Sequence, residues 1–510
     1  MNYFDYSLEK LNEYEQVRDC LSRKKSCQVT GCGDSQLAHF INGLSNGYKQ
    51  KVIVTFSAIK AKELYDDMKG FTDDVVMYPA KDLIFFSADV HGSYILQQRL
   101  EFIQKVVENK PFTVIVTVDA FLDKIQPLEK IKDNYIEIGE GSIVEMDALK
   151  TKLAVMGYQA VTQIDSPGQF AIRGSILDIY TLTDETPYRI DFWDDEVDII
   201  KSFDVESQRS IENIESVKIY PASEYFLDKK TIEEGIAKIK KELEKSEKKF
   251  REEFNTEEAN NLKNTVGEFL TNMDINPYSV AIDSYVNYFC ENLVSLMDYF
   301  DEPIFFIDEP ARVEEQLRVV ETEFKESMSH RLLKGYVLSG QTDILWDKNY
   351  ILNRINDQQK VLFTTIAQKV KSFNVEEFVD VDARNVSPYN SQFEMLVEDL
   401  KKYKKQKYSV LLVTSSATRG KRLAQDLRDF QISAFFESDS EREVQPGQVM
   451  IVKGSLRKGF TYPMIKFVAI SDTDIFGEKK KRKRKKHGYS GTTISSFADL
   501  NIGDYVVHEN

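Results

Sequence analysis

Runs of consecutive apolar residues, separated by amphipathic stretches, dominate the first 130 residues. The runs 51–56 (KVIVTF), 75–78 (VVMY) and 113–118 (TVIVTV) have the uniform apolar character of strands that are buried on both faces. Between them, 58–71 and 94–108 repeat apolar positions at helical spacing. Strands that alternate with helices of this length predict an α/β domain with a parallel sheet.

The segment 188–194 instead alternates with a period of two. Its two faces carry Tyr188, Ile190 and Phe192 on one side and Arg189, Asp191 and Trp193 on the other. This alternation predicts a strand with one buried face in an antiparallel sheet. The polar face has two interpretations. Either Trp193 packs under a loop while Arg189 pairs with Asp191 or Glu196, or Arg189 and Trp193 form an exposed surface that binds a protein.

Later segments return to the first pattern. The apolar runs 304–307 and 360–366 predict two more buried strands. The first 130 residues contain too few strands for a full doubly wound sheet, so we infer that these later strands complete it. Residues 131–222, with a strand, a helix and several strands joined by short turns, are then an inserted α+β domain. A capping box at 231–234 predicts the start of a charged, solvated helix.

Composition narrows the classes of function. The 510 residues carry a formal net charge of −16, which argues against a general nucleic-acid coat. Four cysteines without a signal peptide indicate the reducing cytoplasm. Cys27, Cys32 and His39 are close in sequence but lack a second ligand cluster for zinc. No apolar run approaches the ~20 residues that cross a bilayer.

A glycine-containing segment partly fits the phosphate-binding template G-x-x-x-x-G-K-[ST]. Gly33 and Ser35 match, but Gln28 replaces the first glycine and Asp34 replaces the lysine, with Gly31 between them. Because that lysine neutralises the β- and γ-phosphates, a carboxylate in its place opposes nucleotide binding. We therefore expect this degenerate phosphate loop to be inactive.

Two further features have both a structural and a functional interpretation. Asp308 and Glu309 follow a predicted strand, where a Walker-B acid pair would lie, but without the lysine a structural carboxylate pair is the simpler interpretation. The basic block 479–486 (KKKRKRKK) predicts an extended linker, with a nucleic-acid contact as the alternative. The final residues begin a strand pattern that stops without a turn, as in a piece of a longer chain.

Several separated motifs together resemble the transcription-repair coupling factors, in the order of that family. The motifs are PGQFAIRG (167–174), YRIDFWDDE (188–196), YPAKD (78–82), QRL (98–100), QRS (208–210), KGF (458–460) and GDYVVH (503–508). The resemblance covers nearly the whole chain. This part of the family is itself related to the excision-repair protein UvrB.

The resemblance implies a fold class and a division of the chain. The fold class is α/β multidomain, with a degenerate RecA-like (helicase-type) lobe, an inserted small α+β adaptor domain and a second α/β domain. The expected segments are 1–130 for the first part of the lobe, 131–222 for the UvrA-binding-type insertion, 223–375 for the completed lobe with its charged helix, 380–477 for the third domain, 478–492 for the basic linker, and 493–510 for the start of an RNA-polymerase-interacting domain.

The resemblance also implies a function. The segment would be a non-catalytic adaptor that recruits UvrA to stalled RNA polymerase, with Arg173, Arg189 and Trp193 as UvrA-binding residues. No cofactor is expected here, because ATP and Mg²⁺ would serve only the motor domains, which would also contact DNA. The alternative function is an active UvrB-like ATPase or damage-binding helicase, which would need a working phosphate loop. A purely structural scaffold, in which the Arg173, Arg189 and Trp193 face binds nothing, is a third possibility.

Overall fold

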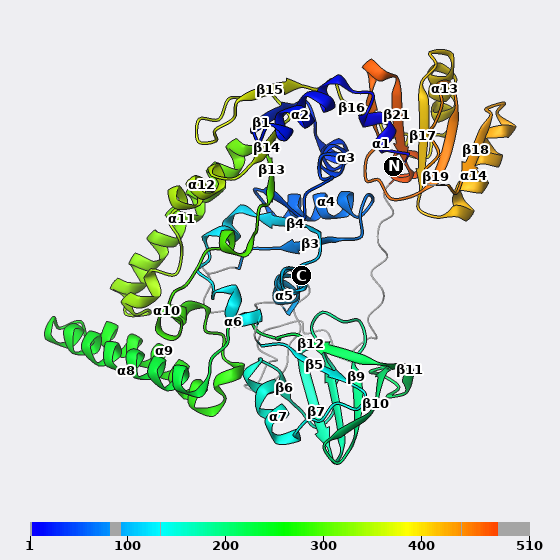
Figure 1. Cartoon of the computed structure of the whole chain (residues 1–510). Coiled ribbons are helices and arrows are strands. Elements are labelled where there is room, and N and C mark those ends of the chain that lie inside the picture. The colour runs from blue at the N-terminus through cyan, green and yellow to red at the C-terminus, as the bar shows by residue number, and fades with distance from the viewer. Residues whose placement is uncertain (1–2, 82–92, 133, 440, 478–510) are drawn as a thin grey trace, which may run out of the picture.

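The structure, a computed structural model, describes residues 3–81, 93–132, 134–439 and 441–477 (Figure 1). The predicted basic linker and the predicted polymerase-interacting segment lie outside these residues. Among the described residues, no helix combines the length and the apolar character that a membrane span requires.

The first domain, which we call the lobe, is built on a seven-stranded parallel sheet with the order β15-β1-β14-β13-β2-β4-β3. The later strands β13 and β14 lie between β1 and β2, which confirms that they complete the first sheet. The strands are β1 (Cys27–Thr30), β2 (Gln50–Thr55), β3 (Val75–Tyr78), β4 (Phe112–Thr117), β13 (Ile304–Asp308), β14 (Lys360–Thr364) and β15 (Glu377–Asp380).

Helices cover both faces of this sheet, which explains the uniformly apolar strands. In β2, Val52 and Val54 pack into the hydrophobic cluster on one face, and Ile53 packs into the cluster on the other. The first cluster includes residues of α5 (Ser93–Glu108), α11 (Pro310–Leu333) and α12 (Lys348–Asn356). The second includes residues of α1 (Asp5–Leu8), α2 (Asn12–Ser22), α3 (Asp34–Leu44) and α4 (Ala58–Met68).

The inserted domain begins and ends with one antiparallel pair of strands, β5 (Ile136–Gly139) and β12 (Ser216–Ile219). This pair brings the two ends of the insertion together, so the chain leaves the lobe and returns to it at neighbouring positions. Between them lie α7 (Met146–Val155) and a six-stranded sheet, in the order β11-β10-β9-β8-β7-β6. The strands are β6 (Gln159–Ala160), β7 (Gln169–Arg173), β8 (Ile176–Tyr180), β9 (Tyr188–Trp193), β10 (Glu196–Phe203) and β11 (Ser210–Ile214).

A buried ionic network joins the inserted domain to the lobe. Arg99 of α5 has no exposed surface, and its Nε lies 2.7 Å from Oε1 of Glu224, which follows β12. Its Nη1 lies 2.8 Å from Oδ2 of Asp123 and donates to the Pro79 carbonyl, while Nη2 donates to the Tyr78 hydroxyl. The QRL and YPAKD motifs therefore meet at this joint.

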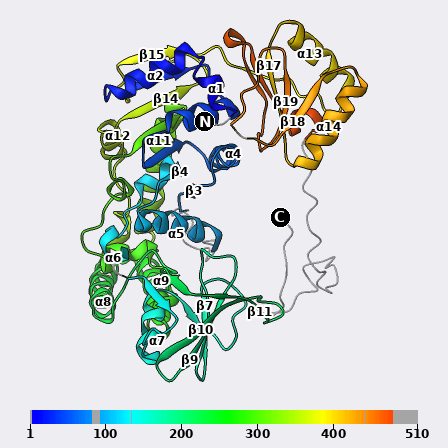
Figure 2. The ribbon, with the colours of Figure 1, turned by 45° about the vertical axis from the view of Figure 1, so that its right-hand side comes forward.

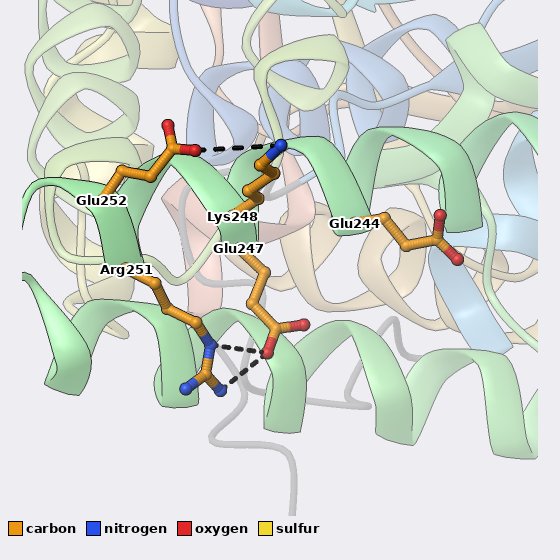
Figure 3. Close-up of a pocket in the computed structure, with 5 residues that line it drawn as sticks. All are labelled: Glu244, Glu247, Lys248, Arg251 and Glu252. Atoms are coloured by element: carbon orange, nitrogen blue, oxygen red, sulfur yellow. Dashed lines mark hydrogen bonds and ion pairs between the residues drawn. The ribbon is translucent and has the colours of Figure 1, made fainter.

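A helical hairpin of α8 (Lys229–Glu252) and α9 (Thr256–Ile275) follows the inserted domain. The predicted capping box at 231–234 is wrong, because the helix begins earlier and Asp228 is its N-cap, accepting a hydrogen bond from the Thr231 amide. A shallow hollow on α8 is lined by residues that pair with each other, such as Arg251 with Glu247 and Lys248 with Glu252 (Figure 3). Its charges form a solvated helix face, as the sequence indicates.

The third domain contains a mixed six-stranded sheet with the order β16-β20-β21-β17-β19-β18. It lies beside the lobe, and the inserted domain lies below the lobe in both views (Figures 1 and 2). This arrangement confirms the predicted fold class. The elements are β16 (Arg384–Asn385), α13 (Phe393–Lys405), β17 (Ser409–Thr414), α14 (Ala417–Asp429), β18 (Ala434–Glu437), β19 (Val449–Lys453), β20 (Phe460–Tyr462), β21 (Phe467–Ser471) and α15 (Asp472–Phe476).

Candidate functional site

One face of the inserted sheet carries the three residues that the sequence singles out. Ala171 of β7 pairs with Asp178 of β8, which pairs with Arg189 of β9. Paired residues point to the same face, and so do residues two apart along a strand. Arg173 and Trp193 therefore share the face of Arg189. We call this surface, with Asp178 at its centre, the Arg–Trp face.

A single buried carboxylate holds both arginines. Asp178 has no exposed surface and accepts two hydrogen bonds from Arg189, at 2.7 Å from Nε and 2.9 Å from Nη2. Arg173 donates to the same carboxylate. The hydrogen bonds to Asp178 raise the pKa of Arg189 above its ordinary value. Two cations thus share one anion, which leaves the cluster with a net positive charge.

The predicted alternative, in which Trp193 packs under a loop, is wrong. Trp193 is 80% exposed. Arg189 pairs with Asp178 rather than with Asp191 or Glu196, and Asp191 pairs with Lys201 at 3.1 Å. The Arg189 side chain instead lies over the Phe203 ring, 4.4 Å from its centroid, and is 19% exposed. The Arg173 side chain is 46% exposed.

The face extends to a residue that the sequence gave no reason to select. Ile143 forms a bridge with Glu196, which itself pairs with Trp193 across the β9–β10 turn. The two residues of each pair point to the same face of the sheet, so Ile143, Glu196 and Trp193 lie side by side on one face. Ile143 is 83% exposed. The only sequence signal was the apolar pair Ile143 and Val144 after a polar stretch, with Ile143 fifty positions before Trp193.

The degenerate phosphate loop is a short connection with a closely packed backbone. Gln28, at the position of the template's first glycine, lies inside β1, where its Nε2 donates to the Gln368 carbonyl at 2.9 Å. Only residues 31–33 connect β1 to α3. Gly31 has φ of +93°, and a Cβ there would lie 2.2 Å from the Val381 carbonyl oxygen, so glycine is required by close packing.

Asp34 and Ser35, at the lysine and serine positions of the template, contact the third domain. The Asp34 carboxylate lies 3.0 Å from Nη2 of Arg457 and 3.2 Å from Nζ of Lys458. Partial burial raises the pKa of Asp34, but the two cations outweigh burial and bring it below its ordinary value. The Ser35 hydroxyl donates to Asp67 at 2.6 Å and accepts from the Lys458 amide.

A cleft of about 420 Å³ opens beside this loop at the carboxyl ends of the strands. Asp308, Glu309, Lys60 and Arg312 are among its lining residues. Asp308 is buried and accepts a hydrogen bond from the Thr55 hydroxyl at 3.0 Å. Glu309 accepts one from the Thr365 amide at 2.9 Å. Both carboxylates therefore already bond to the protein at the ends of the strands.

Replacing Asp308 with asparagine is expected to stabilise the fold at neutral pH. Burial raises the pKa of Asp308 from 3.8 to about 6. Between these two pH values the folded chain holds a proton that the unfolded chain has released, so the free energy of unfolding falls as pH rises from 3.8 to about 6. Asparagine keeps the acceptor for Thr55 without the charge. We expect a gain of about 1–2 kcal/mol in the free energy of unfolding near pH 8, measured by urea denaturation.

The same gain should disappear near pH 4, where Asp308 of the native chain is protonated. The control Glu302→Gln, on an exposed carboxylate before β13, should change neither value. A loss of stability in Asp308→Asn at both pH values would contradict this account of the buried charge.

The three residues considered as zinc ligands, Cys27, Cys32 and His39, are all buried. Burial raises the pKa of both Cys27 and Cys32, which keeps the thiols protonated. His39 is buried and uses its two ring nitrogens on Tyr462 and the Phe4 carbonyl. Within the described residues, no group of three or more His, Cys, Asp or Glu side chains could hold a metal ion.

Comparisons with known proteins find one domain model and several similar proteins. Residues 136–225 match the family model described as the UvrB interaction domain. The transcription-repair-coupling factor of Bacillus subtilis is 29% identical over 94% of this chain and 41% of its own length. That of Staphylococcus epidermidis is 27% identical over 98% of this chain and 42% of its own length.

Among solved structures, the chain is similar to a protein titled XPD_Helicase. The identity is 10% and the TM-score is 0.23, over 87% of this chain and 80% of that chain. The strand order of the sheets, and not this similarity, defines the fold class. The chain spans about two fifths of the length of the curated relatives that it matches. It resembles the N-terminal part of the transcription-repair-coupling factors along nearly its whole length, and its inserted domain corresponds to the UvrB interaction domain.

Proposed function

We propose that this chain is a non-catalytic adaptor segment of a transcription-repair-coupling factor, which recruits UvrA to RNA polymerase stalled at DNA damage. The observation that carries the proposal is the Arg–Trp face. It lies on the domain that matches the UvrB interaction domain, and it exposes an arginine and a tryptophan that no other described element covers.

The geometry of the face suits recognition of an acidic protein surface. Asp178 fixes the plane of the Arg189 guanidinium through two hydrogen bonds and holds Arg173 through one, which reduces the side-chain entropy that is lost on binding. Arg173 is bonded through one nitrogen in the described contacts, and about half of its side chain is exposed to a partner's carboxylates. Trp193 adds a rigid aromatic surface, and Ile143 widens the apolar part.

The remaining roles follow from the family resemblance. In the full-length protein, polymerase would bind through the domain that begins near 493. ATP and Mg²⁺ would serve a DNA-translocating motor outside this segment. The lobe contributes the scaffold that holds the inserted domain. Its short loop and the Asp34 carboxylate argue against the alternative of a UvrB-like ATPase.

Binding to UvrA tests the proposal directly. We expect Trp193→Ala and Arg173→Ala each to weaken the affinity of the whole chain for UvrA by about tenfold or more, because Trp and Arg are enriched among hot-spot residues, whose truncation costs about 2 kcal/mol or more. Affinity would be measured by biolayer interferometry with immobilised UvrA. Circular dichroism would establish that each variant is folded.

The matched control is Arg422→Ala, an exposed arginine on α14 of the third domain. Like Arg173→Ala, it removes one positive charge from the chain, so both variants lose the same non-specific electrostatic attraction to UvrA. Its affinity should equal that of the native chain. Undiminished UvrA binding by the Arg173→Ala/Trp193→Ala double variant would exclude the Arg–Trp face as the binding site.

A further inference from the structure

The lobe and the third domain share a hydrophobic core. The cluster that contains Phe306 and Phe363 of the lobe continues into Leu411, Met450 and Phe460 of the third domain. A continuous core between two domains fixes their relative position more firmly than a small polar contact does. The edge of this shared core is formed by the degenerate phosphate loop.

At that edge, three carboxylates of the lobe face two cations of the third domain. Arg457 Nη2 lies 3.0 Å from Asp34 and 3.6 Å from Glu63, and its Nε lies 3.2 Å from Asp67. Lys458 Nζ lies 3.2 Å from Asp34. Asp67 has no exposed surface, and the side chains of Asp34 and Arg457 are each 21% exposed. The pairs of Arg457 with Asp34 and Asp67 are therefore better shielded from solvent than an ordinary surface pair, whereas Lys458 is 47% exposed.

Uncharged groups add a second set of bonds across the same junction. Asn385 of β16 donates to Asp34 at 3.0 Å and accepts from Gln36 of α3 at 2.8 Å. A Cβ at Gly70 would lie 2.0 Å from the Ser455 carbonyl oxygen, so the two backbones approach closely there. The loop that carries Arg457 is thus held on several sides.

In enzymes with a working phosphate loop, a lysine at the position of Asp34 contacts the phosphates of a bound nucleotide, and an arginine supplied in cis or in trans can meet the same phosphates. Here the lobe supplies the anion itself. We propose that the Asp34 carboxylate is a built-in substitute for a bound phosphate, which docks Arg457 and Lys458 so that the third domain stays fixed to the lobe without nucleotide. We call this contact of Asp34 with Arg457 and Lys458 the interdomain lock.

With this lock, the lobe and the third domain form one rigid unit. A nucleotide-gated contact opens when its phosphate leaves, whereas a covalently attached carboxylate cannot leave. This inference does not depend on UvrA recruitment, because it concerns only the contact between the lobe and the third domain.

Amide hydrogen exchange of the whole chain tests the lock. We expect Asp34→Ala to increase the exchange rate of the amides in 455–459 by about tenfold, which corresponds to about 1.4 kcal/mol. The control Asp66→Ala removes a carboxylate from the same lobe, one residue before Asp67, where it lies 2.8 Å from Nζ of Lys62 on the solvent-exposed side of α4. This control should leave the exchange of 455–459 unchanged.

Anion rescue distinguishes a substitute for phosphate from an ordinary ion pair. Inorganic phosphate at tens of millimolar should restore at least part of the lost protection in Asp34→Ala, because the variant removes the carboxylate beside Lys458 and leaves Arg457 with Glu63 and Asp67 alone. Chloride at equal ionic strength should not. Equal effects of phosphate and chloride would overturn the substitute role.

A second approach remains decisive if Asp34→Ala unfolds. Arg457→Gln removes the cation from the other side and should raise the exchange of 34–37 by a similar factor, without rescue by phosphate. Mg-ATP at millimolar concentration should leave the exchange of the native chain unchanged at 455–459. Increased protection of the native chain by Mg-ATP, or unchanged exchange in both variants, would overturn the proposal.

Discussion

Replacing Arg99 with alanine should lower the free energy of unfolding by about 3–5 kcal/mol. Arg99 has no exposed surface, and its guanidinium bonds to Glu224, Asp123, Tyr78 and the Pro79 carbonyl. Removing it leaves two buried carboxylates with too few cations, because Lys81 alone already serves Glu224 and Asp283 at 2.5 Å each. An uncompensated buried charge is among the most destabilising changes known in proteins.

Urea denaturation followed by circular dichroism would measure this loss. Arg99→Lys should recover only a small part of it, since an ammonium group cannot reproduce the guanidinium fork. The control Arg251→Ala removes an exposed arginine that pairs with Glu247 on α8, and should cost less than about 1 kcal/mol. A loss in Arg99→Ala as small as that of the control would show that the network contributes little to stability.

Acidification should weaken the packing of the lobe against the third domain through His39. The ring is neutral in the folded chain. The Phe4 carbonyl can only accept, so Nε2 donates to it at 3.1 Å, and Nδ1 accepts from the Tyr462 hydroxyl at 3.0 Å. Burial lowers the pKa of His39 from 6.5 to about 4.

The sign of the effect follows from proton binding. Between pH 6.5 and about 4 the unfolded chain binds a proton at His39 that the folded chain does not, so stability falls as pH decreases. The shift of about 2.5 pH units corresponds to about 3 kcal/mol lost by pH 4. Urea denaturation at a series of pH values would measure it as the difference between the native chain and His39→Gln.

Glutamine keeps one donor and one acceptor near the same positions but does not titrate. His39→Gln should therefore lose much less stability than the native chain across this pH range. His330, in the last turn of α11 and exposed to solvent, provides the control, and His330→Gln should follow the native curve. Parallel curves for the native chain and His39→Gln would exclude His39 as the source of the acid sensitivity.

Much of the fold could be predicted from local sequence. The apolar runs in β2, β4, β13 and β14 identify strands buried on both faces, and the alternation in β9 identifies a strand buried on one. These patterns depend only on the period of side chains along a strand, which is a property of neighbouring residues. The start of α8 was misplaced because serine, threonine and aspartate all cap helices, and sequence alone does not choose among them.

The partners of the charged residues depended on tertiary structure. Arg189 bonds to Asp178 rather than Asp191 because the register of β8 and β9 places the two side chains opposite each other. Asp34 is neutralised by Arg457 and Lys458, more than 400 positions away, because the third domain packs against the lobe. Ile143 reaches Trp193 only through a bridge to β10.

The sequence by itself thus determined which segments form strands and helices, the completion of the first sheet by later strands, and the failure of the phosphate template at Gln28 and Asp34. Only the tertiary structure decided that the Arg–Trp face is exposed, and that Asp34 joins two domains. The physical reason is that burial periodicity is written along the chain, whereas ion pairing and exposure depend on strand register and domain packing between distant residues.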